Sequence, residues 1–315
     1  MNAKTRQQIE RMKGQTIGVE IEMNSITREK AAQTVARYFG TTAWYAAREY
    51  GYDAWACKDT QGRVWKFQRD GSINGPDDEK CEMVTPILKY EDMTSLQEIV
   101  RILRKAGAKS DASRGCGVHI HIGAAGHTPK TLRNLANIMA SHESLIVEAL
   151  NISERRIQNY CEPVNPEFLA RLNRSKPETM ARLADIWYES LGANYDRNYH
   201  YNCSRYHMLN LHATFTKGTI EFRLFQFDEP ANGKKNGLHA GQLKSYIQLC
   251  LGLSELAKTL RNASSRPQQH ENPKYAMRTW LLRLGFIGEE FQTARELFTR
   301  RLDGDLAFRN GRNAG

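Results

Sequence analysis

Three short stretches of the chain carry acidic, imidazole and guanidinium groups at alternate positions. In each stretch the residues between them are apolar, which is the period of a half-buried β-strand. Alternate residues of a strand point to the same face of a sheet, so each stretch would present two reactive groups side by side. The three pairs are Glu20 with Glu22, His119 with His121, and Glu221 with Arg223.

Glycine residues stand close to two of these pairs. Gly18 comes two residues before Glu20, and Gly115 and Gly117 precede His119. A glycine in or beside a strand leaves space for a ligand to approach the backbone. A Glu-x-Glu pair alone is more often a solvated sheet face, and a His-x-His pair alone is as often without function. The three pairs together with these glycines favour a binding site.

A sheet face that gathered these groups with Glu82 would hold four carboxylates, Glu20, Glu22, Glu82 and Glu221. At 4 Å and an effective dielectric constant of ~20, each adjacent pair costs about 4 kcal/mol, so protons or cations must accompany them. Two divalent ions would balance the charge. Carboxylate-rich sites that include one imidazole select Mg²⁺ or Mn²⁺, whereas zinc prefers more nitrogen or sulfur.

Magnesium ions beside a guanidinium group such as that of Arg223 suit the phosphates of a nucleoside triphosphate. The chain has no Walker A sequence and no Gly-x-Gly-x-x-Gly, so metal ions and basic side chains would have to hold the triphosphate. Each basic residue alone is also typical of a plain surface charge. The further candidates for phosphate contact are Lys66, Arg69, Arg205 and Lys217.

The surrounding pattern alternates between strand and helix periods and predicts an α+β fold with a mainly antiparallel sheet. Thr27 is a predicted helix N-cap, and Thr60-Gln61-Gly62 is a predicted hairpin turn. Strands are expected over residues 16–23, 55–59, 64–69, 81–85, 118–123, 208–215 and 219–225. Helices are expected over residues 28–39, 96–106, 129–150, 166–173, 177–191 and 238–260.

The chain has 315 residues and a net charge of +10, from 45 basic and 35 acidic residues. This length permits one large domain or two ordinary ones, and the charge favours attraction to polyanions. We expect residues 1–262 to form a catalytic domain and residues 263–315 a helical extension, joined by a polar linker. The predicted extension ends in a basic tail around Arg309 to Arg312.

The first residues of the sequence lack the apolar stretch of a secretory signal, and no uncharged apolar run reaches the ~18 residues of a membrane span. The six cysteines are scattered without a Cys-x-x-Cys pair, which is typical of reduced thiols. We therefore expect a cytoplasmic protein without a membrane partner.

Four motifs occur in the order seen in the amidoligases, and the chain resembles that family over about residues 14 to 260. The amidoligases are carboxylate-amine ligases similar in fold to glutamine synthetase and glutamate-cysteine ligase. The resemblance implies a curved, mainly antiparallel sheet of this catalytic type, with helices packed on one face. The motifs are Gly18 to Glu22 (GVEIE), Asp70-Gly71-Ser72 with Glu82 to Leu88 (EMVTPIL), Gly115 to His121 (GCGVHIH) and Thr219 to Arg223 (TIEFR).

The resemblance also implies roles for individual residues. By position, Arg223 resembles the arginine at the transferred phosphate, while Arg205 and Asn210 resemble residues that line the pocket. Glu22 and Glu82 resemble ligands of the ion nearer the substrate carboxylate. The ligands implied for the ion that binds the ATP phosphates are Glu20, His119 and Glu221.

The reaction implied is ATP-dependent amide or peptide bond formation through an acyl phosphate, with a carboxylate, an amine, ATP and Mg²⁺ or Mn²⁺ as participants. Asp70 is a candidate to accept the proton of the amine, although an Asp-Gly-Ser turn is more often structural. His121 is a candidate substrate contact, with metal ligation as the alternative. The aromatic and basic segment from Tyr195 to Arg205 is either a recognition wall for an acidic peptide or an ordinary polar loop.

Three other functions are compatible with the sequence. A zinc hydrolase would use His119 and His121, and a third histidine would come from His142, His207 or His212. A basic nucleic-acid-binding protein would use the charge of the chain, although no recognised binding motif supports it. An ATP:guanidino phosphotransferase would use the same ATP site and leave the phosphate on its product.

Overall fold

The computed structural model describes residues 3–229, 237–267 and 270–307, so the predicted basic tail at Arg309 to Arg312 lies outside the described residues. The chain divides into two compact units. The strand-rich unit comprises Thr16–His121 and Phe225–Lys244, and the helix-rich unit comprises Met1–Gln15, Ile122–Leu224 and Ser245–Gly315. Residues 245–315 belong to one unit, and the division expected after residue 262 stays a prediction.

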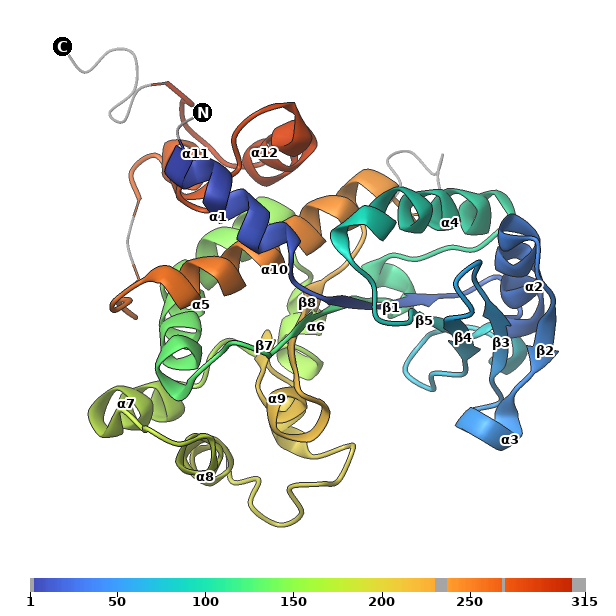
Figure 1. The fold of residues 1–315 in the computed structure, drawn as a ribbon, viewed down its shortest axis with the longest axis horizontal. Helices are drawn as coiled ribbons and strands as arrows, with labels where there is room; N and C mark the ends of the chain where they lie inside the picture. Colours follow the sequence, from blue (N-terminus) through green and yellow to red (C-terminus); the bar gives the residue numbers. More distant parts are fainter. Residues whose placement is uncertain (1–2, 230–236, 268–269, 308–315) are drawn as a thin grey trace. The chain divides into compact units, whose positions relative to one another are not determined.

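Strands of the strand-rich unit follow one another in the order β2-β3-β4-β5-β1-β6. The first five of these strands are labelled in Figure 1. The pairings of β2 with β3, β3 with β4, β4 with β5 and β5 with β1 are antiparallel, which confirms the predicted 55–69 hairpin and the antiparallel sheet. The last two residues of β6 belong to the helix-rich unit. The bounds are β1 Ile17–Met23, β2 Ala43–Tyr45, β3 Trp55–Lys58, β4 Val64–Gln68, β5 Cys81–Val84 and β6 Val118–Gly123.

Helix α2 (Arg28–Phe39) packs against β2, β3, β4 and β5, and against α4 (Met93–Lys105). Its start confirms the predicted N-cap, because the Lys30 N–H donates to Thr27 Oγ1 at 3.2 Å. The strands bury apolar side chains at one set of alternate positions, such as Phe67 and Met83. The polar residues at the other positions therefore share the opposite face, which we call the site face.

The helix-rich unit is built mainly from helices that pack pairwise, α5 with α7 and α12, α7 with α8, and α11 with α12. The long helix predicted over residues 129–150 is α5, and Pro129 is its first residue. Among the described residues, no helix combines the length and apolarity that crossing a membrane demands. The bounds are α1 Ala3–Lys13, α5 Pro129–Leu150, α6 Glu154–Asn159, α7 Pro166–Ser175, α8 Met180–Ser190, α9 His212–Lys217, α10 Ala240–Thr259, α11 Pro273–Arg283 and α12 Gln292–Thr299. Helix α10 begins in the strand-rich unit and continues in this one.

The strand predicted over residues 208–215 is wrong for most of its length. Only β7 (Leu209–Asn210) is a strand, and it pairs with β8 (Thr219–Phe225). The chain then turns into the short helix α9, and the Asn210 side chain accepts a hydrogen bond from the Ala213 N–H of that helix at 3.4 Å, a local contact that competes with a strand. Gly218, with φ +68°, ends that helix.

Glu143 of α5 is a largely buried carboxylate that the predicted function does not use. Its side chain accepts a hydrogen bond from the Val164 N–H at 3.0 Å. Burial raises the pKa of Glu143 from 4.5 to about 7, although that hydrogen bond acts in the opposite direction. The folded protein therefore binds this proton more tightly than the unfolded chain does.

We expect Glu143→Gln to stabilise the protein at pH 8 by about 1–2 kcal/mol. The difference between the folded and unfolded pKa of Glu143 sets an upper limit of ~3 kcal/mol. The expected gain is smaller because solvent reaches part of the side chain. The pKa is raised on folding, so the wild-type protein loses stability as the pH rises from about 4.5 to 7. Thermal unfolding midpoints between pH 5 and pH 8 should diverge from those of Glu143→Gln as the pH rises. Glu148→Gln, at an exposed position of the same helix, should follow the wild type. Parallel profiles for wild type and Glu143→Gln would contradict this prediction.

Candidate functional site

Antiparallel pairing places two predicted metal ligands directly opposite each other. Glu22 of β1 faces Glu82 of β5, and Glu82 in turn faces Gln68 of β4. Side chains at opposed positions of neighbouring strands lie ~4.5–5.5 Å apart at Cβ, and like charges there are destabilising. Glu22 and Glu82 thus form the repulsive pair that the sequence predicts, on the site face.

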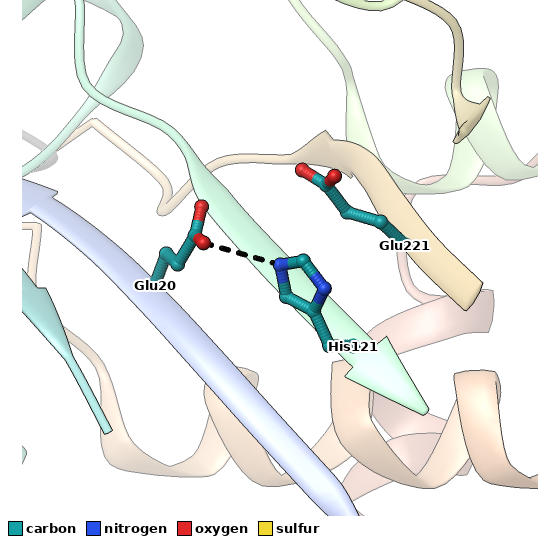
Figure 2. A group of neighbouring side chains, drawn as sticks. All are labelled: Glu20, His121 and Glu221. Atoms are coloured by element: carbon teal, nitrogen blue, oxygen red, sulfur yellow. Dashed lines mark ion pairs between the residues drawn. The ribbon is translucent and has the colours of Figure 1, made fainter. Parts of the chain in front are cut away.

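The two histidines of β6 lie beside the glutamates of β1. His119 Nδ1 lies 3.0 Å from Glu20 Oε2, and His119 Nε2 lies 3.7 Å from Glu22 Oε1. His121 Nε2 forms an ion pair with Glu20 Oε1 at 3.2 Å (Figure 2). The backbone N–H of Gly117 donates to Glu22 Oε2 at 2.5 Å. This geometry confirms that both pairs predicted from alternation share one face.

Two of the glycines expected to leave room for a ligand serve close packing instead. A Cβ on Gly18 would lie 3.3 Å from His121 Cβ, so this glycine lets the imidazole approach β1. Gly115 has φ +70°, and a Cβ there would lie 3.0 Å from the Ser72 carbonyl oxygen. The glycines therefore position the histidines and the Asp70-Gly71-Ser72 turn.

Two overlapping groups of these side chains bring their ligand atoms within 4.8 Å of one another. One group is Glu20, Glu82 and His119, and the other is Glu22, Asp70 and Glu82. We call these five residues the acidic cluster. Four carboxylates and one imidazole make a donor set that fits Mg²⁺ or Mn²⁺. None of the groups of this kind found in the described residues contains two histidines, so the donor set does not favour zinc.

The titration of two glutamates reflects this crowding. Burial acts to raise the pKa of Glu20, but the charge of His121 and hydrogen bonds from both histidines hold that pKa well below its usual range. For Glu82, burial and then the charges of Glu20 and Glu22 raise the pKa well above its usual range. The crowding therefore opposes the ionised form of Glu82, and protons and a divalent cation would compete for this carboxylate.

Other predicted site residues of the strand-rich unit have structural partners. Asp70 Oδ1 accepts hydrogen bonds from the backbone N–H and from Oγ of Ser72, both at 2.7 Å, so it also forms the expected turn. Lys66 extends from the site-face side of β4, with its Nζ 5.2 Å from the centre of the Tyr50 ring. Arg69 pairs with Asp77 at 2.7 Å and is exposed, which makes it a weaker candidate for phosphate contact.

Gln68 is a site residue that the sequence analysis missed. Its Nε2 donates to Glu82 Oε2 at 2.7 Å. Gln68 lies two residues after Lys66 in a predicted strand, so the sequence indicates that both side chains point to the same face. Because the amide fixes one oxygen of Glu82, Gln68 orients a candidate metal ligand.

We expect Gln68→Leu to weaken the binding of Mn²⁺ by about 10–100-fold while the protein stays folded. The reason is that Glu82 loses the donor that fixes its orientation. Calorimetric titration of Mn²⁺ into the purified protein measures the change. Gln61→Leu, on the exposed hairpin turn, is the matched control and should bind as the wild type does. Equal affinity for all three proteins would exclude the positioning role.

In the helix-rich unit, Glu221 and Arg223 lie on the same side of β8, as predicted. Arg223 Nη1 lies 2.5 Å from Glu221 Oε1, and both side chains are buried. Asn210 Nδ2 donates to Glu221 Oε2 at 2.7 Å, and Arg156 Nη2 donates to the Arg223 carbonyl oxygen at 3.0 Å. The Glu221 carboxylate thus forms an ion pair with the Arg223 guanidinium and accepts a hydrogen bond from the Asn210 amide.

A pocket of about 210 Å³ opens beside this pair within the same unit. Arg205 lies over the rings of Tyr201 and Tyr206, at 5.4 Å and 5.7 Å. Burial, and then the charge of Arg205, lower the pKa of His212. The residues that line the pocket include Arg205, Asn210, His212, Lys217 and Glu221.

The three histidines considered as a third zinc ligand have other partners in the helix-rich unit. His142 stacks on Trp280, with 4.1 Å between ring centroids. His207 Nδ1 lies 3.0 Å from the carbonyl oxygen of residue 163, and His212 Nδ1 lies 2.7 Å from the Tyr188 hydroxyl. These contacts give each imidazole a local structural role.

Comparison with protein families gives a match over residues 13–254 to the family described as "Putative amidoligase enzyme". The chain belongs to this amidoligase family. The resemblance inferred from the four motifs is confirmed, and the matched stretch contains all of them. The role of each residue of the amidoligase motifs stays a prediction.

No curated protein matches this amidoligase chain. Among solved structures, it is similar to a bifunctional glutathione synthetase from Pasteurella multocida, with 14% sequence identity and a TM-score of 0.47. That alignment covers 95% of this chain and 49% of the synthetase chain, so this chain spans about half the length of that structure.

Proposed function

We propose that this amidoligase joins a carboxylate to an amine in an ATP-dependent reaction that passes through an acyl phosphate. The observation that carries the proposal is the acidic cluster, a set of four carboxylates and one imidazole in which Glu22, Glu82 and His119 are buried. Such a set is costly without cations. Family membership supports the same reaction class. We also propose that the sheet is of the glutamine-synthetase type and that the protein is cytoplasmic.

The divalent cations, Mg²⁺ or Mn²⁺, would be held in the strand-rich unit by Glu20, Glu22, Glu82 and His119. When bound, these ions offset the repulsion between ATP phosphates and the substrate carboxylate. Glu221 stays a predicted ligand of the ion at the ATP phosphates. His121, which pairs with Glu20, orients that glutamate in this proposal.

In the first step, a carboxylate oxygen of the substrate attacks the γ-phosphorus of ATP, the bond to the β-γ bridging oxygen breaks, and ADP leaves. In the second, the amine nitrogen attacks the acyl carbon and inorganic phosphate leaves. Asp70 is the proposed acceptor of the proton that the amine loses. Arg223 is proposed to neutralise charge on the transferred phosphate, and Lys66 to contact the triphosphate. Arg205 is proposed to contact the substrate.

Incubation of the purified protein with Mg-ATP and a pool of amino acids and peptides tests the function. The expected result is ADP release that depends on the pool, with a product whose mass equals the two substrates minus water. A product that has gained a phosphoryl group would identify a phosphotransferase. Zinc-dependent hydrolysis without ATP would identify the hydrolase, and salt-sensitive binding to RNA or DNA without ADP release would identify a nucleic-acid-binding protein.

A further inference from the structure

The loop between α8 and α9 is fixed by a buried asparagine. Asn202 is fully buried, and its Nδ2 donates to the carbonyl oxygens of Ala193 and Asp196 at 3.0 Å and 2.9 Å. Its Oδ1 accepts hydrogen bonds from the Ser204 N–H at 3.0 Å and from Ser204 Oγ at 2.7 Å. These four bonds give the loop one defined conformation, which distinguishes it from an ordinary polar loop.

This fixed loop presents three tyrosines to solvent. Tyr195, Tyr199 and Tyr201 are 63%, 48% and 44% exposed. The rings of Tyr199 and Tyr201 meet edge to face at 5.9 Å, and the Tyr195 hydroxyl accepts a hydrogen bond from the Cys203 N–H at 3.0 Å. Large aromatic side chains held in the open are typical of a surface that contacts a ligand or partner.

The neighbouring pocket carries more positive than negative charge. Arg205 and Lys217 line it, and the structure gives neither of them a carboxylate partner among the residues it describes. Its acidic residue, Glu221, is already paired with Arg223. A pocket of about 210 Å³ is smaller than the ~300–1,000 Å³ of sites that enclose a drug-sized molecule, so it suits one charged end of a longer ligand.

We propose that this pocket binds a carboxylate of an acidic peptide substrate through Arg205 and Lys217. The peptide chain then continues along Tyr199 and Tyr201, because the Tyr201 ring contacts the Tyr199 ring and also lies 4.6 Å from the ring of His200, which lines the pocket. The inference rests on the proposed ligase function and names the class of its carboxylate substrate. Carboxylate and phosphate oxygens share the chemistry that guanidinium and ammonium groups recognise, and the size of the pocket favours the carboxylate.

Fluorescence anisotropy of labelled peptides, without ATP or divalent ions, tests the proposal on the full chain. We expect a fluorescein-labelled tetraglutamate to bind at least about tenfold more tightly than the matched tetraglutamine. Lys217→Gln should weaken tetraglutamate binding by about tenfold, because a charge-assisted hydrogen bond is lost. Tyr199→Ala should weaken binding of the same peptide several-fold. Lys130→Gln, an exposed lysine at the start of α5, is the control and should leave binding unchanged.

Equal binding of the two peptides, or no effect of Lys217→Gln, would overturn the proposal. Tripolyphosphate that binds more tightly than tetraglutamate, with the larger dependence on Lys217, would instead assign the pocket to phosphate. The binding experiment needs no turnover. Peptide binding without ADP release would therefore refute the ligase function alone, and ADP release with unaltered binding by Lys217→Gln would refute this inference alone.

Discussion

Replacing Glu22 by glutamine is expected to reduce ADP release by more than about 100-fold, because a buried ligand of the acidic cluster loses its charge. The amide keeps an oxygen that can accept the hydrogen bond from the Gly117 N–H, so the fold should survive. The thermal unfolding midpoint of the metal-free protein should stay the same or rise, because Glu22 no longer repels Glu82 across the strands. Steady-state kinetics and thermal unfolding of the same preparation give both readings.

Glu29→Gln provides the matched control for this prediction. Glu29 lies on α2, is exposed, and accepts a hydrogen bond from Gln33 at 2.9 Å. Its replacement should change neither activity nor the unfolding midpoint appreciably. Unchanged activity in Glu22→Gln, and in Glu221→Gln as well, would end the argument for a metal site. A large fall in stability of Glu22→Gln would instead show that its charge supports the fold.

Replacing Arg223 by alanine is expected to have the largest effect on stability, a loss of about 3–5 kcal/mol. The substitution leaves Glu221 charged and buried without its guanidinium partner. A loss of this size would lower the thermal unfolding midpoint by roughly 10 °C. Activity should be lost as well, since Arg223 is the proposed contact of the transferred phosphate.

The double variant Arg223→Ala with Glu221→Gln shows how much of the lost stability comes from the unpaired Glu221 charge and how much from the lost packing of the Arg223 side chain. Because it removes the unpaired charge, it should recover part of the lost stability although it lacks both ionised groups. The exposed pair Arg182–Asp185, separated by 3.8 Å, supplies the control, and Arg182→Ala should cost at most about 1 kcal/mol. A double variant that is less stable than Arg223→Ala would contradict the proposed role of the Glu221 charge.

The alternation of polar and apolar residues was sufficient to predict β1, β6 and β8, because a period of two depends only on neighbouring residues. The same pattern failed after Asn210. There the Asn210 side chain bonds to the Ala213 N–H of a short helix, and alternation does not register such a local contact. β2, with three residues, carried too short a pattern to be predicted.

The sequence predicted which residues belong to the site more completely than it predicted how they lie relative to one another. Family motifs nominated Glu82, but the register that places it opposite Glu22 depends on pairing between strands about 60 residues apart. Gln68 was missed because its role depends on that same register. The close contact of Gly18 with His121 likewise follows from the pairing of distant segments, and no local pattern contains it.

Titration of the purified protein with Mn²⁺, followed by electron paramagnetic resonance of the free ion, tests most directly whether the acidic cluster is a cation site. We expect saturable binding at pH 7.5 that weakens as the pH falls, since protons compete with the cation at Glu82. We also expect Glu22→Gln and Glu82→Gln each to weaken the binding. Manganese that stays free in the presence of the wild-type protein, or that binds both variants as tightly, would contradict the assignment of a cation site.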